Sequence, residues 1–155
     1  MTSEFDMSTV KIPYGVLHDS ELIGVSCENN SMIFSFKFDI YPEDYTDDFY
    51  KQYENFKHCD MIVEMNEEPF NYFRLETCMN NSGKFQGLCL NREDFLNVIN
   101  NASNVTFVEC AVSYREFTVE LCVDYYHAKG KYKKYKKYHM CYITLDAAKV
   151  KWKWY

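Results

Sequence analysis

The sequence predicts an α+β domain: a mainly antiparallel β-sheet of about eight short strands, with two helices packed on one side. Two observations lead to this prediction. The chain of 155 residues contains 14 Tyr, 12 Phe and 2 Trp, and aromatic residues favour strands. Short stretches of alternating apolar and polar residues are also separated by turn signals rather than by long linkers. With 47% hydrophobic and 26% charged residues, we expect one domain over residues 1–155.

The first predicted elements are a loose arm and a hairpin. Residues 1–12 are expected to form the loose N-terminal arm. Residues 21–28 and 31–39 flank Asn29-Asn30, and asparagine tolerates the left-handed backbone of a tight turn. The second stretch places an apolar residue at every other position, which predicts a row facing the core. The row consists of Met32, Phe34, Phe36 and Phe38.

The middle of the chain predicts two helices and three strands. In residues 42–57 the aromatic residues recur every three or four positions, which predicts an amphipathic helix. Strands are expected at residues 60–65, 70–78 and 84–90, the last two joined by a turn at residues 80–83. A second helix is expected at residues 91–102, because Asn91 is a suitable N-cap and apolar residues follow at helical spacing. Those residues are Phe95, Leu96 and Ile99.

The C-terminal third predicts strands after Asn104, and the clearest alternation lies in residues 116–125. One face of that strand is apolar and the other is largely acidic. The apolar residues are Phe117, Val119, Leu121, Val123 and Tyr125; the opposite row is Glu116, Thr118, Glu120, Cys122 and Asp124. Residues 138–145 and 149–155 predict two further strands. The second of these carries Lys149, Lys151 and Lys153 on one face.

Charge is divided unevenly along the chain. The net charge is −6, but residues 1–127 carry 22 acidic and 8 basic side chains, a net of −14. Residues 128–155 carry 1 acidic and 9 basic side chains, a net of +8. Such an asymmetry indicates electrostatic partners.

The densest basic stretch interleaves lysine with tyrosine and allows three interpretations. Lysines can bind phosphates while aromatic rings stack on bases, which would make the stretch a nucleic-acid site. A solvated tip of a hairpin is the simplest structural alternative. The third is internal pairing of the terminal lysine row with Glu116, Glu120 and Asp124. The candidate nucleic-acid-binding residues are Lys131, Tyr132, Lys133, Lys134, Tyr135, Lys136 and Lys137.

The densest acidic stretch lies near the first predicted helix. Carboxylates beside aromatic rings suit the surface of a basic protein, and complementary charge speeds encounter. Favourable electrostatics at the helix end and solubility are the alternative explanation. The candidate partner-binding residues are Asp39, Tyr41, Glu43, Asp44, Asp47 and Asp48.

The sequence predicts no catalytic residue, no metal site and no cofactor, and hence a protein without enzymatic activity. It contains no glycine-rich phosphate loop, nucleophile elbow or His-Glu-x-x-His motif. His18-Asp19 is the most suggestive pair for acid–base chemistry, but neighbours on a strand point to opposite faces, so a structural turn is the favoured interpretation. His139 and Cys141 are expected to share one face of a strand, where they would supply two ligands of a metal site.

The compartment is predicted from the N-terminus and the cysteines. Residues 1–7 are polar and acidic, unlike a signal peptide, and no apolar run is long enough to span a membrane. The seven cysteines are odd in number and none forms a Cys-x-x-Cys motif. These features predict a cytoplasmic protein with buried, reduced thiols.

One segment carries a resemblance to a known group. Leu17-His18-Asp19-Ser20-Glu21-Leu22-Ile23-Gly24-Val25 is followed by a turn and the alternating residues 31–38. This arrangement resembles the opening of small bacterial immunity-type proteins from polymorphic toxin systems. The resemblance implies a non-enzymatic protein that binds and blocks a toxin. A phage-encoded inhibitor of a host defence system is the alternative, since it would have much the same composition.

Overall fold

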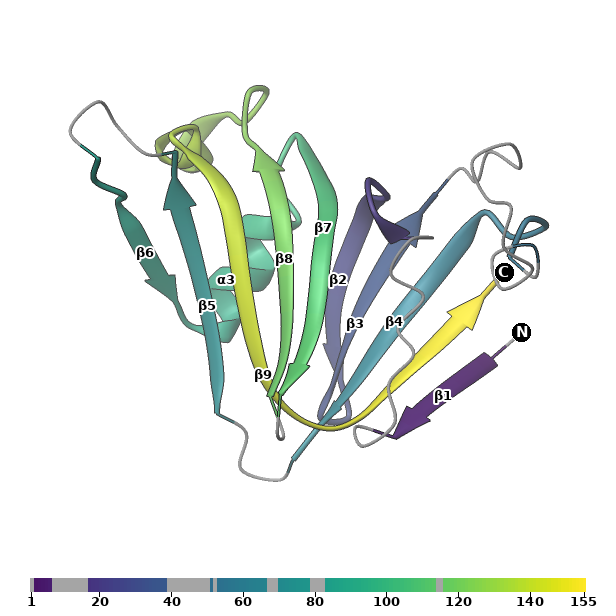
Figure 1. Ribbon diagram of the computed structural model, residues 1–155. Coiled ribbons are helices and arrows are strands. Elements are labelled where there is room, and N and C mark those ends of the chain that lie inside the picture. Colours follow the sequence, from purple (N-terminus) through teal and green to yellow (C-terminus); the bar gives the residue numbers. More distant parts are fainter. Residues whose placement is uncertain are drawn as a thin grey trace.

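The computed structural model describes residues 2–6, 17–38, 51, 53–66, 70–78, 83–113 and 116–155. Within these residues the chain forms one mainly antiparallel sheet, as predicted, with few helical segments (Figure 1). The elements are β1 (Thr2–Asp6), β2 (Glu21–Glu28), β3 (Ser31–Lys37), β4 (His58–Met65), β5 (Asn71–Thr77), β6 (Gly87–Leu90), α3 (Arg92–Ile99), β7 (Asn104–Ser113), β8 (Glu116–Asp124), the 3-10 helix η2 (Gly130–Tyr135) and β9 (Tyr138–Trp154).

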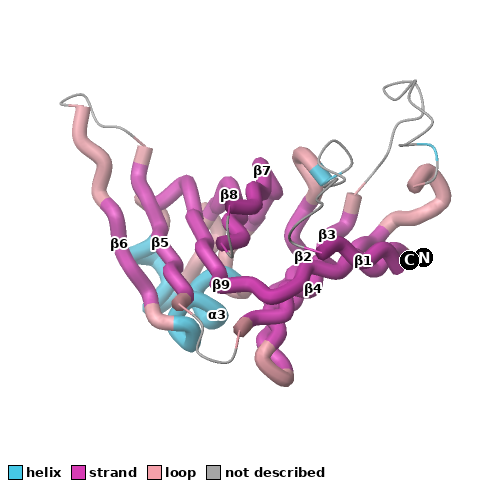
Figure 2. The backbone as a smooth tube through the Cα atoms, turned by 60° about the horizontal axis from the view of Figure 1, so that its bottom comes forward, coloured by secondary structure: helices cyan, strands magenta, loops and turns pink. Residues whose placement is uncertain are grey.

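The long strand β9 organises the sheet. Its first half pairs with β8 on one side and β5 on the other, whereas its second half pairs with β4 and β1. The register against β4 shifts between Ala147 and Lys149, and an extra residue of this kind bends a strand. Two separate strands were expected here, but one continuous strand of 17 residues joins two leaves that curve around a shared core (Figure 2).

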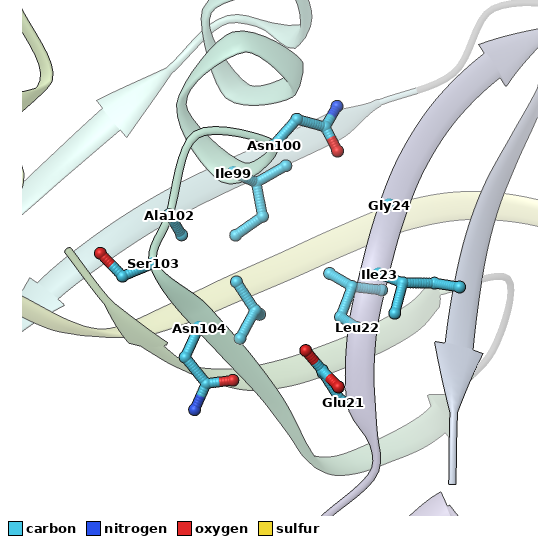
Figure 3. Close-up of a pocket in the computed structure, with 10 residues that line it drawn as sticks. Glu21, Leu22, Ile23, Gly24, Ile99, Asn100, Ala102, Ser103 and Asn104 are labelled. Carbon is cyan, nitrogen blue, oxygen red and sulfur yellow. The ribbon is translucent and has the colours of Figure 1, made fainter. Parts of the chain in front are cut away.

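The two leaves also meet at a second seam, between β2 and β7. The strands pair there through Glu21 and Thr106, and backbone bonds link Phe107 to Asp19 and Ser20. Beyond this point the strands diverge (Figure 3). The pairings therefore run in a ring from β4 through β3, β2, β7, β8 and β9 back to β4, with β1 and the β5–β6 hairpin attached outside it.

The core lies between the leaves and is built from the alternating rows. Every member of the predicted rows of β3 and β8 is buried. Phe36 packs against Phe107 of the opposite leaf in an edge-to-face contact, with 5.4 Å between the ring centroids. On the other side Phe95 of α3 stacks on Phe73 of β5 at 4.4 Å. The helix thus fills the space where the strands separate.

Two local predictions from the first half of the chain are confirmed. Asn29 and Asn30 both have positive φ, 46° and 62°, which is the geometry of a tight hairpin turn. Asn91 caps α3, because its side chain accepts a hydrogen bond from the backbone N–H of Asp94 at 2.8 Å. The local chemistry of these asparagines is sufficient to set both features.

Other expectations differ from the structure or fall outside the described residues. Residues 2–6 of the expected arm form β1 on β9. The first predicted helix lies largely outside the described residues; Lys51 is helical, but residues 53–57 form a turn and irregular chain. No helix in the described part of the chain is long and apolar enough to cross a bilayer.

Candidate functional site

The outer surface of β7, β8, β9 and β5 carries a cluster of carboxylates, which we call the acidic sheet face. On β5, β8 and β9 these side chains point away from the core because they alternate with buried residues, and Glu109 of β7 is exposed. The acidic sheet face comprises Glu76, Glu109, Glu116, Glu120 and Asp146.

Like charges stand opposite each other on this face. Glu120 of β8 lies opposite Glu109 of β7. Glu116, at the start of β8, lies opposite Asp146 of β9. Like charges in directly opposed positions destabilise a strand pair, and a hydrogen bond from the Asn66 amide to Asp146 at 2.6 Å offsets part of this cost.

Glu120 shows the electrostatic result most clearly. Burial, together with the charge of Glu109, raises the pKa of Glu120 above its ordinary value. The Glu120 carboxyl forms side-chain hydrogen bonds with Tyr142 on one side and Glu109 on the other. Tyr142 favours the charged form of Glu120 and Glu109 disfavours it, but burial is the largest of these effects and the pKa is raised overall.

The row continues across the next strands. Tyr142 lies opposite Glu120, and Arg74 of β5 lies opposite Tyr142. Burial followed by the charges of Glu120 and Glu76 raises the pKa of Tyr142, which stays a neutral donor. A pocket of about 230 Å³ is lined by Glu109, Glu120 and Tyr142, together with the threonines at positions 118 and 144.

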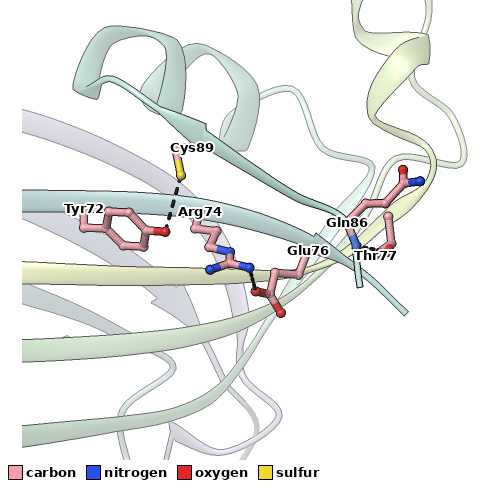
Figure 4. A network of polar contacts seen from close by, with 6 residues as sticks. All are labelled: Tyr72, Arg74, Glu76, Thr77, Gln86 and Cys89. Atoms are coloured by element: carbon pink, nitrogen blue, oxygen red, sulfur yellow. Dashed lines mark hydrogen bonds and ion pairs between the residues drawn. The ribbon is translucent and has the colours of Figure 1, made fainter. Parts of the chain in front are cut away.

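Arg74 borders the acidic sheet face and is held by its own neighbours. Its Nη2 atom lies 2.6 Å from Oε1 of Glu76 (Figure 4). Gly87 on β6 leaves room for the guanidinium, because a Cβ atom there would come within 2.6 Å of Nε of Arg74. Cys89 donates a hydrogen bond to the Tyr72 hydroxyl at 3.3 Å beside it. These contacts anchor Arg74 at the β5–β6 end of the face.

Charges on the other leaf follow the opposite pattern. Lys151 binds the Glu64 carboxylate, and Lys153 lies opposite Asp60. The third interpretation of the lysines, in which the terminal row faces Glu116, Glu120 and Asp124, is therefore wrong. The second half of β9 turns away from β8 at its bend and lies between β4 and β1.

The predicted lysine- and tyrosine-rich residues form η2 and the turn after it, in the connection between β8 and β9. Lysine and tyrosine separate completely there, because a 3-10 helix has three residues per turn and the tyrosines recur every third position. Tyr135 and Tyr138 are buried and Tyr132 is half-buried, while the lysines are exposed. The exposed lysines are Lys131, Lys133, Lys134, Lys136 and Lys137.

The other candidate residues are distributed as follows. The predicted acidic partner-binding residues (Asp39, Tyr41, Glu43, Asp44, Asp47 and Asp48) lie outside the described residues. His18 and Asp19 form an exposed turn before β2, with 3.0 Å between Nδ1 and Oδ2. The Asp19 N–H also binds the Phe107 carbonyl, so this turn ties β2 to β7.

Not all thiols are buried as expected, and His139 and Cys141 do not share one face of their strand. All seven cysteines are free; Cys59, Cys110 and Cys141 are buried, but Cys78, Cys89 and Cys122 are exposed. Burial raises the pKa of Cys110 to about 12. His139 is exposed whereas Cys141 points into the core, because the register shifts at the start of β9. In the described parts of the chain no three His, Cys, Asp or Glu side chains gather as a metal site.

Comparison of the chain with protein-family models, curated proteins and solved structures finds no match. The functional argument therefore depends on the surfaces themselves. Sequence reasoning singled out Glu120 but missed Glu109 and Tyr142. These residues come together through the pairing of strands that are distant in the sequence. The one signal in the sequence was that both strands carry acidic residues.

Replacing Glu120 with glutamine is expected to stabilise the protein at about pH 7.5 by a few tenths to about 1 kcal/mol, the usual size of a cross-strand charge effect. The pKa of Glu120 is raised on folding. Its contribution to stability is therefore fully present below the unfolded pKa, about 4.3, and is lost as the pH rises through the folded value. Urea unfolding at about pH 3.5 should show no gain for the variant.

Glu64→Gln is the matched control for this prediction. It removes one carboxylate from a strand of the same sheet, but this carboxylate binds Lys151. The control should lower the free energy of unfolding at neutral pH, by up to about 1 kcal/mol. A Glu120→Gln variant that loses stability at neutral pH, or gains equally at both pH values, would contradict the proposed repulsion.

Proposed function

We propose that this protein is a non-enzymatic binding protein whose acidic sheet face occludes a basic protein partner. The observation that carries the proposal is the pairing of like charges across β7, β8 and β9. A basic partner would relieve the repulsion that the free protein bears, so part of its binding energy would come from this relief.

The rest of the surface chemistry supports a protein partner. Tyr142 and Tyr72 share the outer surface with the carboxylates, and tyrosine is enriched in protein interfaces because it offers a large contact area with a polar end. Four adjacent strands hold these side chains in fixed positions. Such a preorganised surface loses little conformational entropy on binding.

The kind of partner follows from the resemblance of the segment around His18 and Asp19. An immunity-type role would make the partner a toxin, and a phage-encoded anti-defence role would make it a host protein. In either case the protein would inhibit its partner by covering the partner's surface, not by a chemical reaction. The acidic residues 39–48 remain a predicted second contribution to the same encounter.

The test compares capture by three forms of the immobilised full-length protein from a lysate of the native host. Glu109→Gln/Glu120→Gln neutralises the centre of the acidic sheet face. Glu28→Gln/Glu54→Gln makes the same change in net charge at two exposed positions elsewhere. Quantitative mass spectrometry of the captured proteins, at low salt and with rising salt, gives the readout.

The expected result is a basic protein that the wild type and the Glu28→Gln/Glu54→Gln control retain and that salt releases. The Glu109→Gln/Glu120→Gln protein should lose it. Equal retention by all three forms would reject the acidic sheet face as the binding surface. Recovery of only neutral or acidic proteins, insensitive to salt, would reject a basic partner.

A further inference from the structure

A second surface lies where β8 ends and β9 begins, and we call its lysines the basic pole. The six lysines are all exposed, and residues 125–145 contain no Asp or Glu. The basic pole comprises Lys129, Lys131, Lys133, Lys134, Lys136 and Lys137. A local concentration of positive charge on a protein of net charge −6 requires a specific explanation, because net charge alone disfavours polyanions.

The basic pole lies over a row of packed tyrosine rings. Tyr135 packs against the buried Tyr125 at 5.8 Å between ring centroids and against Tyr138 at 6.3 Å. Tyr132 continues the row at 6.4 Å from Tyr135. These rings attach η2 to the core, so the lysines between them are presented from a fixed backbone rather than from a loose loop.

The lysine side chains are also positioned. The ammonium groups of Lys131, Lys134 and Lys137 each lie 5.1 Å from the centroid of the tyrosine ring that follows in the chain. Cation–π contacts at this distance favour one location for the charge. Lys131 and Lys134 lie about 6 Å apart along η2, whose rise is about 2.0 Å per residue, and Lys137 follows in the turn after it.

Two exposed aromatic rings adjoin these lysines. Tyr126 is 71% exposed, and the ammonium of Lys136 lies 5.6 Å from its ring. Phe85 is 53% exposed and precedes Gln86, whose side chain accepts a hydrogen bond from Lys137 at 3.1 Å. Gln86 is itself fixed by two backbone links to Thr77 at the end of β5 (Figure 4).

We propose that the basic pole binds single-stranded nucleic acid, with the lysines on the phosphates and Tyr126 and Phe85 stacked on bases. Lysine rows flanked by exposed aromatic rings are the usual chemistry of sequence-independent single-strand binding. An acidic protein and an anionic membrane are the competing ligands, and the heparin, vesicle and Tyr126→Ala arms of the test separate them from a nucleic acid. This inference concerns a different surface from the acidic sheet face and does not depend on the proposed function.

The test measures fluorescence anisotropy of a labelled oligothymidylate of about 20 nucleotides, longer than one typical site, with the full-length protein at several salt concentrations. Lys133→Gln/Lys136→Gln/Lys137→Gln removes three cations. It should weaken binding and reduce the slope of log affinity against log salt by about 2, since each single-strand phosphate contact contributes about 0.7. Lys37→Gln/Lys51→Gln/Lys57→Gln, with the same net charge, should leave the slope unchanged.

The ring contribution has its own variant. Tyr126→Ala should weaken binding of the oligonucleotide about tenfold, the effect of losing one stacked base, and should not change binding of heparin, which has no bases. Tyr155→Ala removes another exposed tyrosine and serves as the control. Circular dichroism of each variant establishes that it is folded.

Three results would overturn the inference. One is absence of binding to the oligonucleotide at low salt. Another is affinity that both lysine variants reduce equally, which would indicate a response to net charge alone. The last is binding of heparin or of phosphatidylserine vesicles that is as tight as that of the oligonucleotide, together with no effect of Tyr126→Ala.

Discussion

Replacing Trp152 with alanine is expected to lower the free energy of unfolding by about 3–5 kcal/mol. Trp152 is 1% exposed, lies in the second half of β9 opposite Met61 of β4, and stacks on Trp154 at 6.4 Å between ring centroids. The change deletes a large side chain from the place where β9 joins the second leaf. Because domains are stable by about 5–15 kcal/mol in total, this single substitution should bring the protein close to unfolding at 37 °C.

Urea unfolding followed by tryptophan fluorescence and circular dichroism measures the effect, with Trp154 as the remaining fluorophore. Lys153→Ala is the matched control, because Lys153 is exposed on the opposite face of the same strand. Its effect should stay within about 0.5 kcal/mol. A loss below about 1 kcal/mol for Trp152→Ala would mean that the second half of β9 is not part of the cooperative core.

Replacing Asn100 with alanine is expected to cost about 2 kcal/mol, the second-largest effect. Asn100 ends α3, and its side-chain amide binds the open edge of β2 at both backbone atoms of Val25. Its Oδ1 accepts from the Val25 N–H at 2.9 Å, and its Nδ2 donates to the Val25 carbonyl at 2.8 Å. The amide thus supplies the hydrogen bonds of a β2 residue at the point where β7 has separated from β2 (Figure 3).

The cost follows from leaving two partly buried backbone groups without this partner, at about 1–3 kcal/mol for each unsatisfied group. Water entering the adjacent pocket of about 220 Å³ should recover part of the loss. Alanine fits the backbone here, because Asn100 has an ordinary helical φ of −71°, so the change isolates the side chain.

Asn101→Ala is the control for this prediction. The Asn101 side chain is exposed and binds within its own helix end, at the Asn97 carbonyl. Its removal should cost no more than about 0.5 kcal/mol. Hydrogen exchange at the Val25 amide should accelerate in Asn100→Ala and not in Asn101→Ala. Equal stability of the two variants would show that the seam does not need the Asn100 amide.

The local features of the chain could be predicted well because their causes are local. The row Phe117 to Tyr125 alternates with polar residues, so its strand and its buried face follow from a period of two. Asn91 caps α3 with its own side chain, and the Asn29-Asn30 turn requires only two residues that accept positive φ. The 3-10 helix could also have been predicted in principle, because Tyr132 and Tyr135 are spaced by its three-residue period.

The candidate site was less accessible to such reasoning. Glu120 was visible as a member of an acidic row, but its partner Glu109 lies beyond a register shift in β7, which disrupts the simple alternation there. The interpretation that paired the lysines of β9 with the acidic row of β8 failed for a related reason. The bend after Asp146 carries them to β4, and opposite charges on either strand would have satisfied the same pairing rule.

The sequence alone therefore determined which segments are strands, which of their faces are apolar, and that positive charge gathers at one end of the chain. These properties depend on the order of neighbouring residues. The tertiary structure alone decided which strands pair, that β9 serves both leaves, and that carboxylates from β7 and β8 meet beside Tyr142. Strand pairing is non-local, since every strand edge presents the same backbone donors and acceptors, and only the packing of the whole core selects among the possible partners.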